Sequence, residues 1–146
     1  MKPRTFSDAP PAGPNVAPGL HVLFVDEEAY VLREFVRAVR QSCEAVAVSD
    51  AGTALRVLEA VGPFDAIVAN FVVPNDWALP LLAAVRTAFP GVLRVLLSGD
   101  PRDHGVVRAT RQQDVDLVFA TPCSPTELLY SMQLACALER VLREAA

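Results

Sequence analysis

Five short apolar runs, each followed by a longer segment of mixed polarity, repeat along this chain. Each run has the length of a buried strand and is bounded by turn or polar residues. The runs lie at residues 21–25, 45–48, 66–69, 92–97 and 117–119. Strands that alternate with helical segments predict a parallel sheet with helices on both of its faces.

Apolar residues recur at steps of three and four between the runs, which is the period of an amphipathic helix. We expect the first helix to extend from the end of the first run to Cys43. Ser49 or Asp50 is placed to cap the second helix, and a weaker fourth helix is predicted over 104–113. The fifth helix starts at the capping box of residues 124–127, which has proline at the first helical position, and runs nearly to the C-terminus.

Right-handed crossovers between parallel strands leave few arrangements for five such units. We expect an α/β fold of flavodoxin-like type, a doubly wound (βα)5 parallel sheet with strand order 2-1-3-4-5. In that order the first and third strands are neighbours, and polar residues follow the strands at one common edge. These residues are Asp26, Glu27, Asn70, Ser98 and Thr121. Ligands and chemistry gather at this edge of open α/β sheets, so the five side chains form the predicted site.

Length and composition indicate one domain behind a short tail. The chain has 146 residues, of which 52% are hydrophobic and 21% charged, a globular composition. Residues 1–19 hold five of the twelve prolines and no apolar periodicity, so we expect a disordered tail there. The domain is expected over 20–140, with 141–146 as the C-terminal end of the fifth helix.

Charge, hydropathy and cysteine spacing argue against several classes of function. The net charge is −4 without a basic cluster, which argues against nucleic-acid binding. No apolar run reaches the length of a membrane span, and residues 1–8 lack the apolar core of a secretory signal, so a cytoplasmic protein without membrane contact is expected. Cys43, Cys123 and Cys136 lack metal-ligand spacing and are interpreted as free thiols.

Four segments of the chain resemble the receiver (CheY-like) domain of bacterial response regulators over about residues 19–140. They are VLFVDEE at 22–28, FDAIVANFVVP at 64–74, LLSG at 96–99 and TPCSPTELL at 121–129. The resemblance implies a site that takes a phosphoryl group from a histidine kinase onto an aspartate after strand three. In this family an acidic pair after strand one holds Mg²⁺, while a hydroxyl after strand four and a lysine after strand five stabilise phosphoryl charge.

This chain departs from the family at two of those positions. Asp26 and Glu27 match the acidic pair and Ser98 matches the hydroxyl, but Asn70 stands at the acceptor and Thr121 at the lysine. Asparagine has no anionic oxygen to attack phosphorus. The only lysine of the chain is Lys2, which lies in the tail, so no neighbouring lysine can substitute. The sequence therefore predicts a degenerate receiver, a pseudo-receiver.

Two interpretations of Asp26 and Glu27 stay open. They are either a residual, weak Mg²⁺ site or a carboxylate pair that is hydrogen-bonded to the Asn70 amide and caps the first helix. We favour the second, because Mg²⁺ loses its water reluctantly and one anionic ligand is missing. No other cofactor is expected.

The function that follows is a phosphorylation-independent, protein-binding signalling module in a two-component or phosphorelay-type pathway, and not an enzyme. The family uses helix four, strand five and helix five as its contact surface, so we expect a protein partner or a second copy of the chain there. The expected contact residues are Val107, Phe119, Leu129, Met132 and Cys136. Because no effector sequence follows Ala146 in this chain, a stand-alone receiver is expected.

Three alternatives remain, and the last two are weaker. A purely structural homodimerisation module, which keeps the fold without the signalling role, stays open. A phosphorylatable receiver would need a substitute acceptor, but Asp65 belongs at the opposite end of strand three and Asp100 lies in a loop before a proline. A small flavodoxin-like enzyme would need a glycine-rich phosphate loop after the first strand, where the sequence has acidic residues instead.

Overall fold

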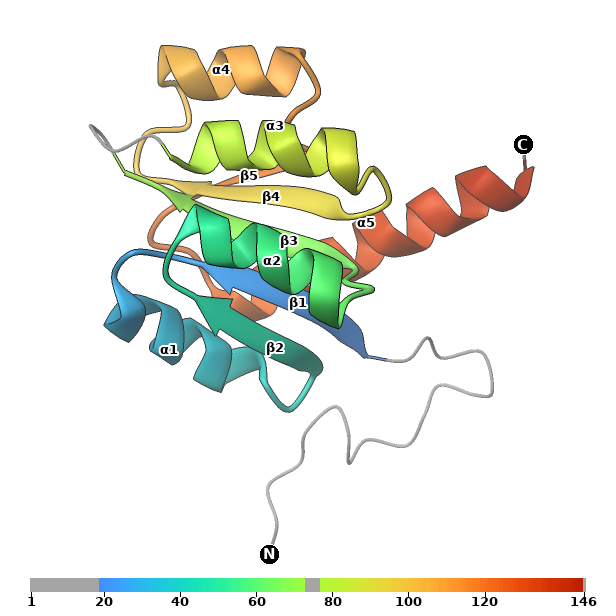
Figure 1. Cartoon of the computed structure of the whole chain (residues 1–146), viewed down its shortest axis with the longest axis horizontal. Helices are drawn as coiled ribbons and strands as arrows, with labels where there is room; N and C mark the ends of the chain where they lie inside the picture. Colours follow the sequence, from blue (N-terminus) through green and yellow to red (C-terminus); the bar gives the residue numbers. More distant parts are fainter. Residues whose placement is uncertain (1–18, 73–76, 146) are drawn as a thin grey trace, which may run out of the picture.

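The computed structural model describes residues 19–72 and 77–145, with only the backbone described for 29–32. Over these residues five parallel strands form one sheet in the order β2-β1-β3-β4-β5, with helices between them (Figure 1). The strands are β1 (Leu20–Val25), β2 (Cys43–Val48), β3 (Ala66–Phe71), β4 (Leu93–Ser98) and β5 (Leu117–Ala120). The helices are α1 (Ala29–Val39), α2 (Ala51–Val61), α3 (Ala78–Ala88), α4 (His104–Arg111) and α5 (Pro125–Ala145). The predicted flavodoxin-like single domain is confirmed.

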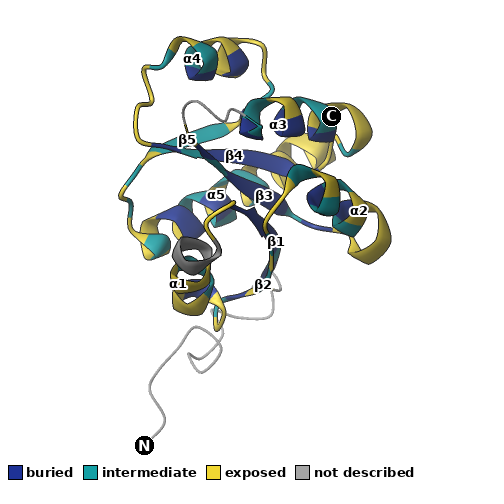
Figure 2. Cartoon of the chain, turned by 60° about the vertical axis from the view of Figure 1, so that its left-hand side comes forward, coloured by how far each residue is buried: buried dark blue, intermediate teal, exposed yellow. Residues whose placement is uncertain are grey.

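The core has two layers because successive strand residues point to opposite faces of the sheet. On one face, Leu23 and Ile67 pack with buried residues of α2 and α3, such as Leu82. On the other face, Phe24 and Val68 pack with buried residues of α5 and the inner side of α1. Figure 2 shows the sheet buried between these helical layers, whose outer surfaces are exposed.

Helix caps confirm the predicted starts of two helices. The Asp50 side chain accepts a hydrogen bond from the Thr53 N–H at 2.7 Å and so caps α2. Ser124 Oγ accepts one from the Glu127 N–H at 3.3 Å, and α5 begins at Pro125 as the sequence predicts. Such caps satisfy backbone donors that have no partner inside the helix.

Three element boundaries differ from the sequence expectation. Cys43 is the first residue of β2, paired in register with Leu20, and does not end α1. Its spacing of four from Val39 satisfies a helical period, but the chain turns between them, where the Ser42 N–H bonds to the Val39 carbonyl. β3 continues through Phe71, because both Asn70 and Phe71 pair with β4. The fourth helix ends at Arg111, two residues before the predicted end.

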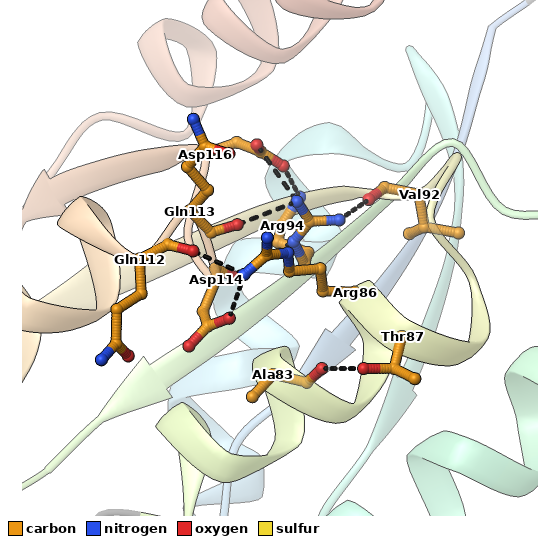
Figure 3. Close-up of polar contacts among 9 residues, drawn as sticks. All are labelled: Ala83, Arg86, Thr87, Val92, Arg94, Gln112, Gln113, Asp114 and Asp116. Atoms are coloured by element: carbon orange, nitrogen blue, oxygen red, sulfur yellow. Dashed lines mark hydrogen bonds and ion pairs between the residues drawn. The ribbon is translucent and has the colours of Figure 1, made fainter.

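Two arginines hold the turn between α4 and β5 (Figure 3). Arg94 lies in β4, is only 7% exposed, and its guanidinium donates to the carbonyls of Val92, Gln113 and Asp114 and to the Asp116 carboxylate. The more exposed Arg86 of α3 reaches the same turn. It donates to the Gln112 carbonyl and pairs with Asp114 at 3.1 Å. Every guanidinium nitrogen of the buried arginine therefore has a hydrogen-bond partner, as expected for a buried charge.

α5 is longer than the layer that it covers. Leu128, Leu129 and Met132 are buried against the sheet, whereas residues 137–145 are exposed and extend beyond the sheet in Figure 1. Large apolar side chains remain exposed along the helix: Tyr130, Leu134, Leu138, Val141 and Leu142. Among the described residues, no helix combines the length and the hydropathy that a membrane span needs.

Candidate functional site

The carboxyl ends of the strands bring together the side chains that the sequence singled out. Asp26 follows β1, Asn70 is the penultimate residue of β3, Ser98 ends β4 and Thr121 follows β5. β1 and β3 are neighbours, and the Thr121 N–H donates to the Ser98 carbonyl at 2.9 Å. Glu27, the other residue of the predicted acidic pair, is exposed.

Asp26 is the buried carboxylate of the site, with 4% of its surface exposed. One oxygen accepts a hydrogen bond from the Glu28 N–H at 2.8 Å, next to the start of α1. The other accepts one from the Asn70 side-chain amide, with 3.3 Å between Nδ2 and Oδ2. Burial raises the pKa of Asp26 above its usual value, and these two hydrogen bonds oppose that rise because they favour the charged form.

These contacts confirm part of the second interpretation of the acidic residues. The Asn70 amide does bond to a carboxylate. The predicted cap of the first helix is not confirmed, because the backbone N–H that bonds to the Asp26 carboxylate is that of Glu28, the residue before α1, and Glu28 makes no side-chain cap. Of the predicted acidic pair, only Asp26 bonds to Asn70, and Glu27 is exposed to solvent. A carboxylate at position 70 would repel Asp26, whereas the Asn70 amide is neutral and donates a hydrogen bond to it.

The Ser98 side chain is hydrogen-bonded to the loop that follows β4. The side chain is 1% exposed, and its Oγ accepts a hydrogen bond from the Asp100 N–H at 3.0 Å. Asp100 is exposed, and its carboxylate accepts from the Arg102 N–H. Asp65 lies at the opposite end of β3, as predicted, where its carboxylate accepts from the His21 N–H. Asp65 is therefore remote from the other candidate residues.

Two open cavities meet at Asn70 and Thr121. The first has a volume of about 350 Å³ and lies on the α1 side of the sheet. Its lining is Asp26, Phe35, Asn70, Leu97, Thr121, Pro122 and Cys123. The second, of about 370 Å³, is lined by Asn70, Phe71, Val72, Ser98, Gly99, Asp100 and Thr121. The sequence did not single out the apolar wall of the first cavity, because its members lie on separate elements and show no motif.

A third cavity, of about 440 Å³, lies at the amino-terminal end of β4, beside the distal half of α5. Its lining includes the Arg94–Asp116 ion pair and Asp65, and none of the residues of the predicted site. Size alone does not make it the functional site. The chemistry-bearing residues converge at the other end of the strands.

The donor set at Asp26 suits Mg²⁺ poorly. Mg²⁺ requires near-octahedral oxygen ligation. Asn70 is a neutral amide where the receiver family has a second anionic ligand, and its nitrogen faces Asp26 in this structure. Over residues 19–72 and 77–145, no group of three or more His, Cys, Asp and Glu side chains is arranged to hold a metal ion.

The expected contact residues divide into two sets. Leu129 and Met132 are 3% and 0% exposed, so their placement on a contact surface is wrong. Helix α5 is apolar on two sides, and the sequence pattern alone did not show which of them faces the sheet. Val107, Phe119 and Cys136 are half-buried, and the last two pack against the core. The exposed apolar side is made by Tyr130, Leu134, Leu138, Val141 and Leu142.

The cysteines are free thiols, as the sequence predicts. Burial raises the pKa of both Cys43 and Cys136 to about 11, so neither is a reactive thiolate near neutral pH. Cys123 lines the first cavity, and burial also raises its pKa.

Comparison with known proteins agrees with the fold. No family model matches the chain. The hydrogenase transcriptional regulatory protein HoxA of Bradyrhizobium diazoefficiens is 24% identical over 123 residues, which cover 84% of this chain. The chain spans only 25% of the length of that relative.

Several of the solved structures with the same fold are receiver domains. A CheY-like response regulator receiver domain protein from Methanospirillum hungatei superposes with a TM-score of 0.74 at 18% identity, over 84% of this chain and 98% of that one. The signal receiver domain of an HD domain-containing protein from Pseudomonas fluorescens gives a TM-score of 0.75 at 24% identity, over 90% of this chain and 99% of that one. The chain therefore has the receiver-domain fold of two-component response regulators.

Proposed function

We propose that this chain is a pseudo-receiver, a signalling module that acts through protein contacts without being phosphorylated. The observation that carries the proposal is the carboxamide of Asn70 at the end of β3, bonded to Asp26. A receiver needs a carboxylate there as nucleophile, and an amide nitrogen whose lone pair is delocalised cannot attack phosphorus. The position that the resemblance assigns to the acceptor is thus chemically inert.

The surroundings of Asn70 support the same conclusion. Thr121 offers a neutral hydroxyl where the family has a lysine, and Lys2 is the only lysine of the chain. Without a cation at that position the charge of a transferred phosphoryl group would be poorly stabilised. The donor set at Asp26 also suits Mg²⁺ poorly, so we propose that the module works without a metal cofactor.

Hydrogen bonds at the surface formed by α4 and β5 support a module whose conformation does not change on phosphorylation. The Ser98 hydroxyl already bonds to the loop after β4, at 3.0 Å from the Asp100 nitrogen. Arg86 and Arg94 tie the turn between α4 and β5 to α3 and β4. With no phosphoryl group to draw Ser98 inward, we expect this face to hold one conformation and its contacts to be constitutive.

We place the contact surface on the exposed apolar side of α5, and its occupant is a second copy of this chain. The five large side chains of this surface, the α5 stripe, recur at steps of three, four or one along the helix: Tyr130, Leu134, Leu138, Val141 and Leu142. Each is more than half exposed, between 55% and 61%. The stripe contains no charged side chain, so two copies can face each other without like-charge repulsion.

The extent of the α5 stripe is compatible with a dimer. Together the five side chains present on the order of 500 Å² of apolar surface, near the upper end of the patches that monomers expose. Two copies would bury about 1,000 Å², roughly the lower limit of a specific interface. A reversible dimer of modest affinity is therefore expected.

Sedimentation velocity over a range of concentrations tests the proposal. We expect a concentration-dependent dimer whose dissociation constant is the same with and without acetyl phosphate and Mg²⁺. Leu138→Glu together with Val141→Glu should give a monomer with unchanged circular dichroism. Arg143→Glu, on the same exposed part of α5 but outside the stripe, is the matched control and should leave the dimer intact.

Two results would contradict the proposal. A dimer that forms only after acetyl phosphate treatment would show a phosphorylatable receiver. A chain that stays monomeric at every concentration would remove the second copy as the occupant of the α5 stripe.

A further inference from the structure

The cavity between α1 and the β5–α5 loop joins one buried anion to an apolar wall. Asp26 is 4% exposed at its inner end, next to the Asn70 carboxamide and Thr121. Phe35, Leu97 and Pro122 form the wall. A small apolar extension of about 20 Å³ continues the cavity between Asp26 and Phe35. This combination of groups defines what could bind there.

The Asp26 carboxylate has no counter-charge among the described residues. None of the ion pairs in this part of the chain involves Asp26. The charged neighbours that act on it, Glu27 and Glu28, are both negative. The groups that face it from β3, β4 and the β5–α5 loop are the neutral side chains of Asn70, Leu97 and Thr121. A buried carboxylate of this kind is stabilised by any cation that can reach it.

We propose that this cavity binds a small organic ammonium ion, with its charged group at Asp26 and its apolar body against Phe35, Leu97 and Pro122. An ammonium group has three donors, and the cavity offers acceptors on Asp26, Asn70 and Thr121. The ring of Phe35 adds an aromatic surface, which favours a cation or a flat apolar body. Binding of a small molecule in this cavity would be a function separate from the protein contacts proposed above.

Charge and shape separate this ligand from other classes. Phosphates and other anions would meet the Asp26 carboxylate, on which Glu27 and Glu28 add further negative charge, without a compensating cation among the lining residues. A hydrated metal ion gains nothing from an apolar wall, and Mg²⁺ in particular loses its water reluctantly. The volume of about 350 Å³ lies at the small end of ligand pockets, which run from roughly 300 to 1,000 Å³.

The threonine at position 121 explains why the cavity is open. Thr121 lines both cavities of the site, and its short side chain leaves the space toward Asp26 free. A lysine at this position would extend an ammonium group into the same space from within the chain. Thr121→Lys is therefore a tethered version of the proposed ligand and should exclude a free one.

A nuclear magnetic resonance titration of the full ¹⁵N-labelled chain tests the proposal. The probe is 2-phenylethylammonium chloride, and 2-phenylethanol is its neutral counterpart of nearly the same shape. We expect saturable shifts of the Asn70 side-chain amide and of the Leu97 and Thr121 backbone amides with the ammonium probe. The alcohol should bind at least tenfold more weakly.

Three variants sharpen the test. Asp26→Asn keeps the shape and removes the charge, so affinity for the ammonium probe should fall at least tenfold. Thr121→Lys should abolish binding, and it remains informative if Asp26→Asn does not fold. Glu59→Gln removes an exposed carboxylate on α2 and should leave affinity unchanged.

Other outcomes would overturn the proposal. Equal affinity for the alcohol would show an apolar cavity without charge selection. Binding that survives Thr121→Lys would place the probe elsewhere on the chain. Saturable shifts of the same amides on addition of millimolar MgCl₂ alone, absent in Asp26→Asn, would show that the carboxylate is a metal site.

Discussion

The side-chain amide of Asn70 donates a hydrogen bond to the Asp26 carboxylate across the neighbouring strands β3 and β1, with 3.3 Å between Nδ2 and Oδ2. The donor is neutral, so it satisfies one oxygen of a buried acid without adding a second negative charge. The same pair of positions carries the nucleophile and a metal ligand in the receiver family that this chain resembles. Under the pseudo-receiver proposal, the pair in this chain stabilises the fold and offers no nucleophile.

Replacing the amide by a carboxylate should therefore destabilise the protein. In Asn70→Asp the lost hydrogen bond and the new repulsion with Asp26 should lower the free energy of unfolding by about 1–3 kcal/mol at neutral pH without divalent cations. Urea unfolding measures this. Mg²⁺ should raise the melting temperature of the variant and not that of the natural chain. An equal gain for both proteins would mean that the natural chain already binds Mg²⁺ at Asp26.

The fold was readable from the sequence because its signals are local. The five apolar runs gave the strands, and Asp50 and Ser124 marked helix starts that the structure confirms. Asn70 and Asp26 could be placed together because the carboxyl ends of neighbouring parallel strands meet at one edge. The conflict at Cys43 arose because a step of four fits both a helix and a turn into the next strand.

What the sequence did not reveal depends on packing between distant elements. Leu129 and Met132 were assigned to a contact surface, but they are buried, because the side of α5 that faces the sheet is set by tertiary packing. The sequence did not predict that Arg94 stabilises the turn between α4 and β5. Arg94 is a single charged residue in an apolar run, and its partners Gln113 and Asp114 lie about twenty residues further along the chain. The apolar wall of the Asp26 cavity comes from separate elements and likewise has no local signature.

The two arginines at the α4–β5 turn should differ in their contribution to stability. Arg94→Met leaves the Gln113 and Asp114 carbonyls without their donor and should cost about 1–3 kcal/mol. Arg86→Met removes a more exposed pair with Asp114 and should cost less than about 1 kcal/mol. Paired denaturation curves measure the difference. Equal effects would mean that burial of Arg94 does not determine its contribution.

The cap of α2 should make stability depend on pH in a definite direction. Hydrogen bonds from the Thr53 N–H and hydroxyl hold the pKa of Asp50 below its usual value. The stabilisation is therefore present above the ordinary pKa, about 3.9, and is lost as the pH falls through the lowered value. Asp50→Ala should melt at a lower temperature than the natural chain at pH 7, with a difference that shrinks below about pH 4. Asp50→Asn keeps an acceptor and should lose less at pH 7.

The N-terminal tail, which lies outside the described residues, should be dispensable for folding. The basis of this prediction is the sequence, because residues 1–18 are rich in proline and lack apolar periodicity. Deletion should change the melting temperature by no more than about one or two degrees. A drop of several degrees would show that the tail packs on the domain.

Intact-mass spectrometry after incubation with acetyl phosphate and Mg²⁺ tests the central claim most directly. The natural chain should gain no phosphoryl group, because Asn70 offers no nucleophile and Thr121 no cation. Asn70→Asp should gain one only poorly, and Asn70→Asp combined with Thr121→Lys should gain more. A stoichiometric gain of one phosphoryl group by the natural chain would contradict the account.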